Sequence, residues 1–187
     1  NSTFMMNSAP DAGGAIYFED LSDVIIEDTT FTFNSAEKGG AIFWQTITET
    51  AVYNTDTMRT IYTKTVTTGN NGVVEDSTFF ANKANYETGL GGALYWNTSS
   101  SNITDTTFLN NTASKGGAIY WVNGTKIDNS TFRFNKAHTG SAIYEDASMT
   151  EMDIIDSSFL ENRADSNRFE DFKVENTSNE IEIVVED

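Results

Sequence analysis

Two short blocks of sequence recur along this chain at a nearly constant interval, and this repetition restricts its fold more than any other feature. The first block is Gly-Gly-Ala followed by Ile or Leu and two further residues, mostly aromatic, as in residues 116–121. Its copies are residues 13–18, 39–44, 91–96 and 140–145, the last with Ser141 in place of the second glycine.

The second block is an Asp or Asn, two hydroxyl residues and a Phe, followed by an Asn three positions after the Phe. Its phenylalanines are Phe4, Phe31, Phe79, Phe108, Phe132 and Phe159. The steps between them are 27, 48, 29, 24 and 27 residues. A period in this range is typical of a repeat architecture. With few prolines and many Thr, Val, Ile, Phe and Tyr residues, the repeats favour strands over helices.

If each period is one coil of a solenoid, equivalent residues stack above one another at about 4.8 Å, the distance between neighbouring strands. Each column must then tolerate copies of itself. One apolar column is Ala15, Ala41, Ala93, Ala118 and Ala142, with Ile16, Ile42, Leu94, Ile119 and Ile143 beside it. Another is Ile26, Val74, Ile103, Ile127 and Ile154. Together with the Phe column, these predict the walls of the core in an all-β solenoid of six to seven coils.

Two aromatic columns follow the Gly pair and fall on opposite faces of a strand. The Trp column is Phe18, Trp44, Trp96 and Trp121; the Tyr column is Tyr17, Phe43, Tyr95, Tyr120 and Tyr144. Parity with the Ile column places the Trp column inside or at a corner and the Tyr column stacked outside. An outer Tyr row could serve as a carbohydrate platform, but structural stacking is the interpretation that we favour.

One polar residue in each period is an Asn after the Phe strand: Asn7, Asn34, Asn82, Asn111, Asn135 and Asn162. A stacked amide can bond to turn backbone and to the amide above it, so we expect a structural ladder. A second column, Asp28, Asp76, Asp105 and Asp156 with Asn1 and Asn129, would stack like charges. Solvation, the interleaved Asn or a bound cation could relieve that repulsion.

The net charge of −17 argues against a nucleic-acid partner or an anionic membrane surface. The acidic excess favours solubility, and calcium on surface carboxylates is the alternative. Cys is absent, and the single histidine, His138, is interpreted as a solvated turn residue. No apolar run is long enough to predict insertion into a membrane, and no cofactor is indicated.

Residues 45–72 interrupt the period between Phe31 and Phe79. Alternating residues, a polar turn and further alternation predict an inserted β-hairpin, and a degenerate extra coil is the alternative. The tail, 165–187, is expected to be an irregular coil or cap on the single domain 1–187. The tail ends on Val184-Val185-Glu186-Asp187, the same four residues as 73–76. Residues 73–76 are followed by Ser77, Thr78 and Phe79, and the chain itself begins with a similar sequence at residues 1–4. The natural continuation of the C-terminal strand therefore resembles residues 1–4.

The pairing of residues 39–42 with Phe31 and Asn34 resembles the repeat of chlamydial polymorphic outer-membrane proteins and of related protist surface proteins. This resemblance implies a right-handed parallel β-helix displayed outside the cell, with a surface or adhesive role.

Acceptor sequons for N-glycosylation are frequent, although chance in an Asn-rich and Thr-rich chain is the alternative. They begin at Asn1, Asn97, Asn102, Asn110, Asn123, Asn129 and Asn176. We expect N-linked glycans on an extracellular protein. The ladder residues are not sequons.

No constellation of acid and base residues stands out, and Lys38, Lys83, Lys115, Lys126 and Lys136 are scattered in turns, so we expect no enzyme. A polysaccharide-active β-helix is the less favoured reading. The matched ends instead suggest that units associate head to tail into a fibre. The rival is a monomeric adhesin segment that holds a receptor or carbohydrate.

Overall fold

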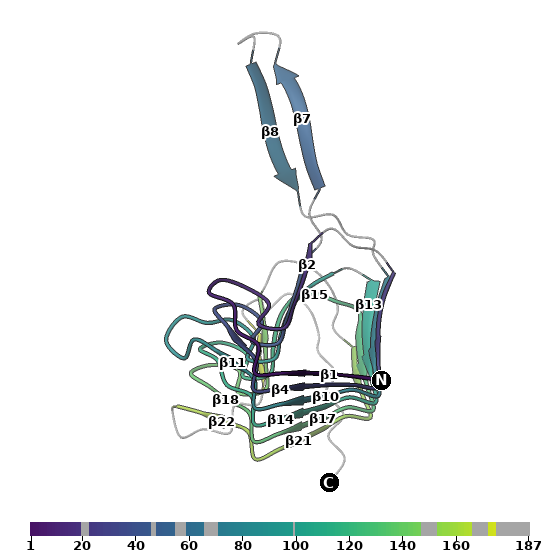
Figure 1. Ribbon diagram of the computed structural model, residues 1–187, viewed down its shortest axis with the longest axis vertical. Helices are drawn as coiled ribbons and strands as arrows, with labels where there is room; N and C mark the ends of the chain where they lie inside the picture. The colour runs from purple at the N-terminus through teal and green to yellow at the C-terminus, as the bar shows by residue number, and fades with distance from the viewer. Residues whose placement is uncertain are drawn as a thin grey trace.

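The protein is a parallel β-solenoid. The computed structural model describes residues 1–19, 23–45, 48–54, 59–65, 71–98, 100–146, 153–165 and 172–174, and among them there is no helix. Each turn of the chain contributes one strand to each of three sheets, and all neighbours within those sheets are parallel. Figure 1 shows the strands stacked in chain order, from purple at the N-terminal end to yellow.

The Phe sheet has the order β1-β4-β10-β14-β17-β21. Its strands are β1 (Ser2–Met5), β4 (Thr29–Thr32), β10 (Thr78–Phe80), β14 (Thr107–Leu109), β17 (Thr131–Arg133) and β21 (Ser158–Leu160). We number coils 1 to 6 by these strands. Short pairs follow at the next corner: β5 (Ser35–Ala36) with β11 (Lys83–Ala84), and β18 (Lys136–Ala137) with β22 (Arg163–Ala164).

The Trp sheet and the Ile sheet complete each coil. The Trp sheet contains β2 (Ile16–Glu19), β6 (Ile42–Gln45), β12 (Leu94–Asn97), β15 (Ile119–Asn123), β19 (Ile143–Glu145) and β23 (Phe172–Val174). The Ile sheet contains β3 (Val24–Glu27), β9 (Asn71–Glu75), β13 (Ser100–Thr104), β16 (Lys126–Asp128) and β20 (Asp153–Ile155). The described strands therefore make five complete turns and part of a sixth, against the six to seven expected.

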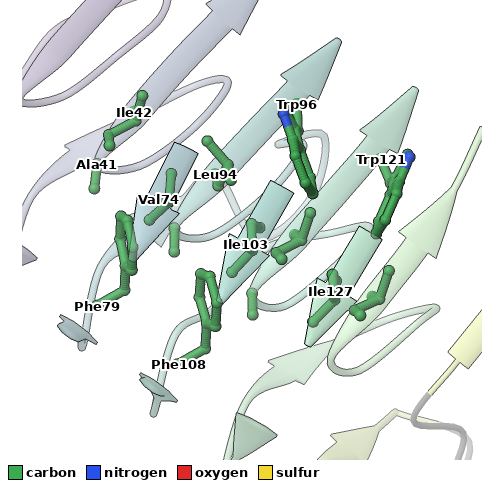
Figure 2. Packing of buried hydrophobic residues seen from close by; sticks show 14 of the residues in the cluster. Ala41, Ile42, Val74, Phe79, Leu94, Trp96, Ile103, Phe108, Trp121 and Ile127 are labelled. Atoms are coloured by element: carbon green, nitrogen blue, oxygen red, sulfur yellow. The ribbon is translucent and has the colours of Figure 1, made fainter. Parts of the chain in front are cut away.

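The core consists of the columns that the repeat aligned. Phe79, Ile103 and Leu94 are fully buried, as are their counterparts in neighbouring coils (Figure 2). The phenylalanine rings stack face to face along the axis, with centroids 4.8–5.0 Å apart and interplanar angles of 3–8°. Such pairs stabilise by about 1 kcal/mol each beyond the area that they bury.

The Trp column lies in the core and the Tyr column lies outside it, as strand parity predicted, but the Tyr column is less exposed than an outer row would be. Trp44, Trp96 and Trp121 are buried in the core, which confirms the inward Trp column. The Tyr column stacks with centroids 4.7–5.4 Å apart, outside the core cluster. It is not an open platform, however, because Tyr120 and Tyr144 are buried and only Tyr17, at the end, is half exposed. The idea of a carbohydrate platform on this column is therefore wrong.

Each coil turns at three corners whose residues have positive φ. The first corner is the Asp column, with φ of 43–49°, where Asp and Asn tolerate the left-handed region. The third is the first glycine of each pair; a Cβ on Gly116 would lie 2.0 Å from the carbonyl oxygen of Ile119. The second corner carries Met6, Phe33, Ala81, Asn110, Phe134 and Glu161, with φ of 53–59°. Most of these residues do not favour that conformation, so the following residue must hold it.

That following residue is the ladder asparagine. Its backbone N and Nδ2 both donate to Oδ1 of the asparagine in the next coil, at 2.9–3.1 Å. From the second coil on, Nδ2 also donates to the Phe carbonyl of the preceding coil, as Asn111 does to Phe79. The ladder thus joins every pair of successive coils and satisfies the backbone at the strained corner.

The segment between β6 and β9 holds two antiparallel strands, β7 (Thr48–Asn54) and β8 (Arg59–Thr65), where the alternation suggested a hairpin. In Figure 1 this ribbon projects away from the stack. The two ends of the insertion meet at its base, since a Cβ on Gly72 would lie 2.3 Å from Cη2 of Trp44. Except for β23, the tail beyond residue 165 lies outside the described residues.

Replacing Asn111 by Ala should lower the free energy of unfolding by about 3 kcal/mol, because the amide of Asn82 and the carbonyl of Phe79 lose buried partners. Asn7→Ala, at the exposed end of the ladder, should cost about 1 kcal/mol. Urea denaturation at low protein concentration measures both values. Equal losses for the two variants would contradict the role of the buried ladder.

Candidate functional site: the open end and the loop face

The N-terminal end of the solenoid is open. β1, β2 and β3 are the outermost strands of their sheets, so each has one edge with no partner strand among the described residues. A hollow of about 340 Å³ lies at this end, lined in part by Phe4, Ile16 and Phe18. These side chains are partly exposed, whereas Phe31, Ile42 and Trp44, their equivalents in coil 2, are fully buried. The apolar side chains of coil 1 are therefore less shielded from solvent than those of coil 2.

The Asn ladder gives this end a chemical polarity. Each ladder Oδ1 accepts from the coil before it, and each ladder N and Nδ2 donates to the coil after it. Asn7 donates to Asn34, and no described residue donates to Oδ1 of Asn7. At the open end, Oδ1 of Asn7 is therefore an acceptor without a described donor. Asn162 is the last ladder residue of the described stack, so a following coil would meet its donors there.

A longer corner loop distinguishes coil 3 from the others. Nine positions separate Asn82 from Gly91, whereas five separate Asn34 from Gly39. The extra length forms a closed turn, residues 85–89, which we call the strap. Gly89 N donates to the carbonyl of Asn85 at 2.7 Å, and the Asn85 side chain accepts from Glu87 N at 2.9 Å. A Cβ on Gly89 would lie 2.3 Å from Asn85 N, so the turn requires glycine there.

The strap contacts the coils on both sides of its own. Ser114 N and Lys115 N in coil 4 donate to Gly89 O at 3.0 and 3.1 Å. Thr88 Oγ1 in the strap donates to Glu37 in coil 2. These contacts fix the turn against the loop face, which is the side that carries β5, β11, β18 and β22 (Figure 1).

Tyr86 extends these contacts to coils 5 and 6. Its hydroxyl donates to Asp165, its ring lies 4.3 Å from that of His138, and Lys136 Nζ lies 4.8 Å from its centroid. His138 Nδ1 also contacts Asp165, and Lys136 Nζ lies 3.8 Å from the same carboxylate. The pKa of the Asp165 carboxyl lies below its ordinary value. The largest cause is the hydrogen bond from Tyr86, and His138 and Lys136 lower the pKa further. His138 keeps 40% of its side chain exposed, as expected for a solvated turn residue, and it is also a partner in this side-chain cluster.

A groove of about 620 Å³ lies beside the strap. Coil 1 contributes Ala9 and Pro10; coils 2 and 3 contribute Ser35, Ala36, Glu37, Lys83, Ala84, Asn85, Tyr86 and Glu87. Lys83 and Glu87 are exposed, and Tyr86 is half-buried. None of these groove residues belonged to a site in the sequence interpretation. The one available signal was the greater distance from Asn82 to Gly91.

The sequons fall into two groups. Asn1, Asn110 and Asn129 are exposed and Asn102 is half-buried, whereas Asn97 and Asn123 are 4% and 6% exposed. The two buried asparagines are register partners in β12 and β15. Asn129 Nδ2 donates to Asp105, so its amide is already engaged. Asn176 lies outside the described residues.

The acidic corner column is solvated. Asp28, Asp76, Asp105 and Asp156 are exposed, and the bond from Asn129 relieves the charge of Asp105. In the described part of the chain, no group of three or more His, Asp or Glu residues is arranged to hold a metal ion. Calcium remains a prediction from composition alone.

A second ladder, of buried hydroxyls, was not predicted. Ser77 Oγ accepts from Thr29 N in the preceding coil at 3.2 Å and donates to Glu75 O at 2.7 Å. Ser130 and Ser157 repeat this pattern. The sequence shows two hydroxyl residues before each Phe, but not that the first of them supports the Asp corner.

Comparisons with known proteins find similarity over part of the chain. The family described as the Chlamydia polymorphic membrane protein repeat matches residues 105–120. A metabotropic glutamate receptor-like protein R of Dictyostelium discoideum is 43% identical over 72 residues, which are 38% of this chain and 4% of that protein. The chain thus spans a small part of that relative. No solved structure matches.

These similarities confirm the resemblance of the repeats to those of polymorphic membrane proteins and indicate a surface protein. Among the described residues, no helix has the length and apolar character needed to cross a membrane.

Glu145 interrupts the Trp column, since β19 pairs it with Trp121. Its Oε2 is buried and has no hydrogen-bond partner in the part of the chain that the structure describes, and burial raises the pKa of this carboxyl. The folded state therefore binds the proton more tightly than the unfolded state does. Glu145 therefore lowers the free energy of unfolding as the pH rises from the ordinary pKa of its carboxyl through the raised value.

Replacing Glu145 by Gln, which mimics the protonated acid, should raise the urea midpoint at pH 7 and leave it nearly unchanged at pH 4. Asp153→Asn, at an exposed carboxylate in β20, is the matched control and should show no such pH-dependent gain. The same increase for Glu145→Gln at both pH values would contradict the raised pKa.

Proposed function

We propose that this chain is an extracellular structural or adhesive segment of a surface protein, and that its solenoid is extended by coils stacked on its ends. The observation that carries the proposal is the open N-terminal end, where Phe4, Ile16 and Phe18 lie at the surface and Asn7 presents a ladder acceptor. Exposed strand edges invite pairing with further strands.

The stacking partner that best complements this end is another coil of the same repeat. Such a coil supplies Phe, Ile and Trp side chains for the hollow, and its ladder amide donates to Asn7. The ladder favours head-to-tail contact, since in that arrangement the ladder donors of one unit meet Oδ1 of Asn7 in the next. Copies of this chain that associate in this way would form a fibre. The stacking coil can equally be part of a longer chain that contains these residues, because the matched region makes up only 4% of the relative.

The second candidate is a monomeric adhesin. The β7–β8 hairpin favours it, because the hairpin interrupts the repeat and projects from the stack (Figure 1). In that function the hairpin would hold a receptor. Deleting residues 46–70 while leaving Gly72 against Trp44 separates the two roles: loss of cell adhesion with intact assembly favours the adhesin.

Neither role requires catalysis, and we propose that the protein is not an enzyme. The Asn, Asp and hydroxyl groups of each coil recur at the same positions in its neighbours and take part in corner geometry. The proposal also includes N-linked glycans on the exposed sequons.

Thr3→Pro tests head-to-tail stacking. Ser2 N and Met6 N donate to coil 2, so strand alternation places the N–H of Thr3 on the open edge. Proline removes that donor at little cost to the internal ladder. We expect concentration-dependent assembly of the unaltered chain in sedimentation velocity and negative-stain images, and its loss in Thr3→Pro.

Thr3→Ala is the matched control, because it removes the side chain and keeps the N–H; this variant should still assemble. Monodisperse monomers of the unaltered chain at high concentration would contradict the fibre. Assembly that persists in Thr3→Pro would contradict the open edge as the contact.

Glycan attachment should follow exposure. When the protein is secreted from a eukaryotic host, Asn110→Gln should remove one glycan from the intact mass, because Asn110 is exposed at a corner. Asn97→Gln should change the mass by the substitution alone, since Asn97 is buried between coils. A spectrum unchanged by enzymatic deglycosylation would show that the sequons are unoccupied.

A further inference from the structure

The groove beside the strap is the largest departure from repetition on the loop face. In coils 1, 2, 4 and 5 this corner is short, and residues in it stack in register, as Thr112 does with Lys136. In coil 3 the strap adds a wall, and Pro10 in coil 1 and Glu37 in coil 2 also line the space. Its volume of about 620 Å³ lies within the range of small-molecule sites.

The strap wall is held in place before any ligand arrives. Tyr86 is fixed through its hydroxyl to Asp165, and Ser114 Oγ donates to Glu87 O at 3.0 Å. Backbone bonds from Ser114 and Lys115 hold Gly89. A wall tied to coils 4, 5 and 6 loses little conformational freedom on binding, which favours affinity.

The polar groups that line the groove carry charges of both signs. Lys83 is exposed, and the structure shows no described partner for its ammonium group. Glu87 is exposed on the strap, and the Glu37 carboxylate accepts from Thr88 with one oxygen. A phosphate or nucleic acid would meet the two carboxylates, and a basic peptide would meet Lys83. The mixed lining instead suits a neutral ligand that both donates and accepts hydrogen bonds.

We propose that this groove binds a neutral oligosaccharide. Sugar hydroxyls can accept from Lys83 Nζ and donate to the carboxylates of Glu37 and Glu87, and the apolar face of a pyranose ring can pack on Pro10 and on the part of Tyr86 that lines the groove. This assignment gives a ligand class to the adhesive function proposed above. It differs from the earlier idea of a carbohydrate platform, because the Tyr column lies outside the groove and is largely buried.

The test uses the full chain from a bacterial host, so that its own glycans do not occupy the groove. Cellotetraose, chitotetraose, maltotetraose and mannotetraose are titrated by calorimetry, with tetralysine as the competing class. At least one saccharide should bind with a Kd below about 1 mM. Lys83→Ala should weaken that binding about tenfold. Lys126→Ala, on the Ile sheet, is the matched control and should leave the Kd unchanged.

Tyr86→Ala should abolish binding, and Tyr86→Phe, which keeps the ring but loses the bond to Asp165, should weaken it less. If the Tyr86→Ala variant does not fold, Lys83→Ala still tests the proposal. The Lys83 side chain is exposed and has no described partner whose loss would destabilise the fold. The proposal is overturned if no saccharide binds at about 1 mM, if only tetralysine binds, or if both alanine variants bind like the unaltered chain. Thr3→Pro separates this site from the stacking end, since it should block assembly and leave saccharide binding intact.

Discussion

The bond from each ladder asparagine to the one in the next coil determines how the rest of this solenoid is arranged. Because one Oδ1 accepts both the backbone N and Nδ2 of its neighbour, the amides must lie directly above one another. That alignment places Phe over Phe and Ile over Ile in the flanking strands, and it sustains a positive φ at residues such as Phe33 and Phe134. A coil shifted by one residue would lose the ladder and turn its core side chains outward.

The columns explain why so much of the fold could be predicted from residue spacing. Phe108, Ile103 and Asn111 recur with a fixed offset, and a recurring residue must pack against copies of itself, which reveals both the stacking and the inward face. The second glycine of each pair follows the same logic: a Cβ on Gly92 would lie 2.1 Å from the carbonyl oxygen of Gly117. The repeat therefore predicted the core, the corners and the Asn ladder together.

Features without a counterpart in the neighbouring coils could not be predicted in this way. Tyr86, His138 and Asp165 are far apart in sequence and belong to different coils, so only the path of the strap brings them together. The burial of Tyr120 and Tyr144 could not be predicted either, because strand parity assigns a side chain to one face of the sheet and does not tell whether that face is exposed. The burial of Asn97 and Asn123 likewise follows from the stacking of β12 on β15, and not from the sequon pattern.

The strap also bears on how a protein of this kind can change in length over evolution. A gene duplication or deletion that adds or removes one whole coil keeps every column intact, since each coil presents the same upper and lower surfaces. Between coils 2 and 6 this freedom is lost, because Thr88 reaches Glu37 on one side and Tyr86 reaches Asp165 on the other. This block would have to be inherited as a unit, whereas coils beyond it can vary in number.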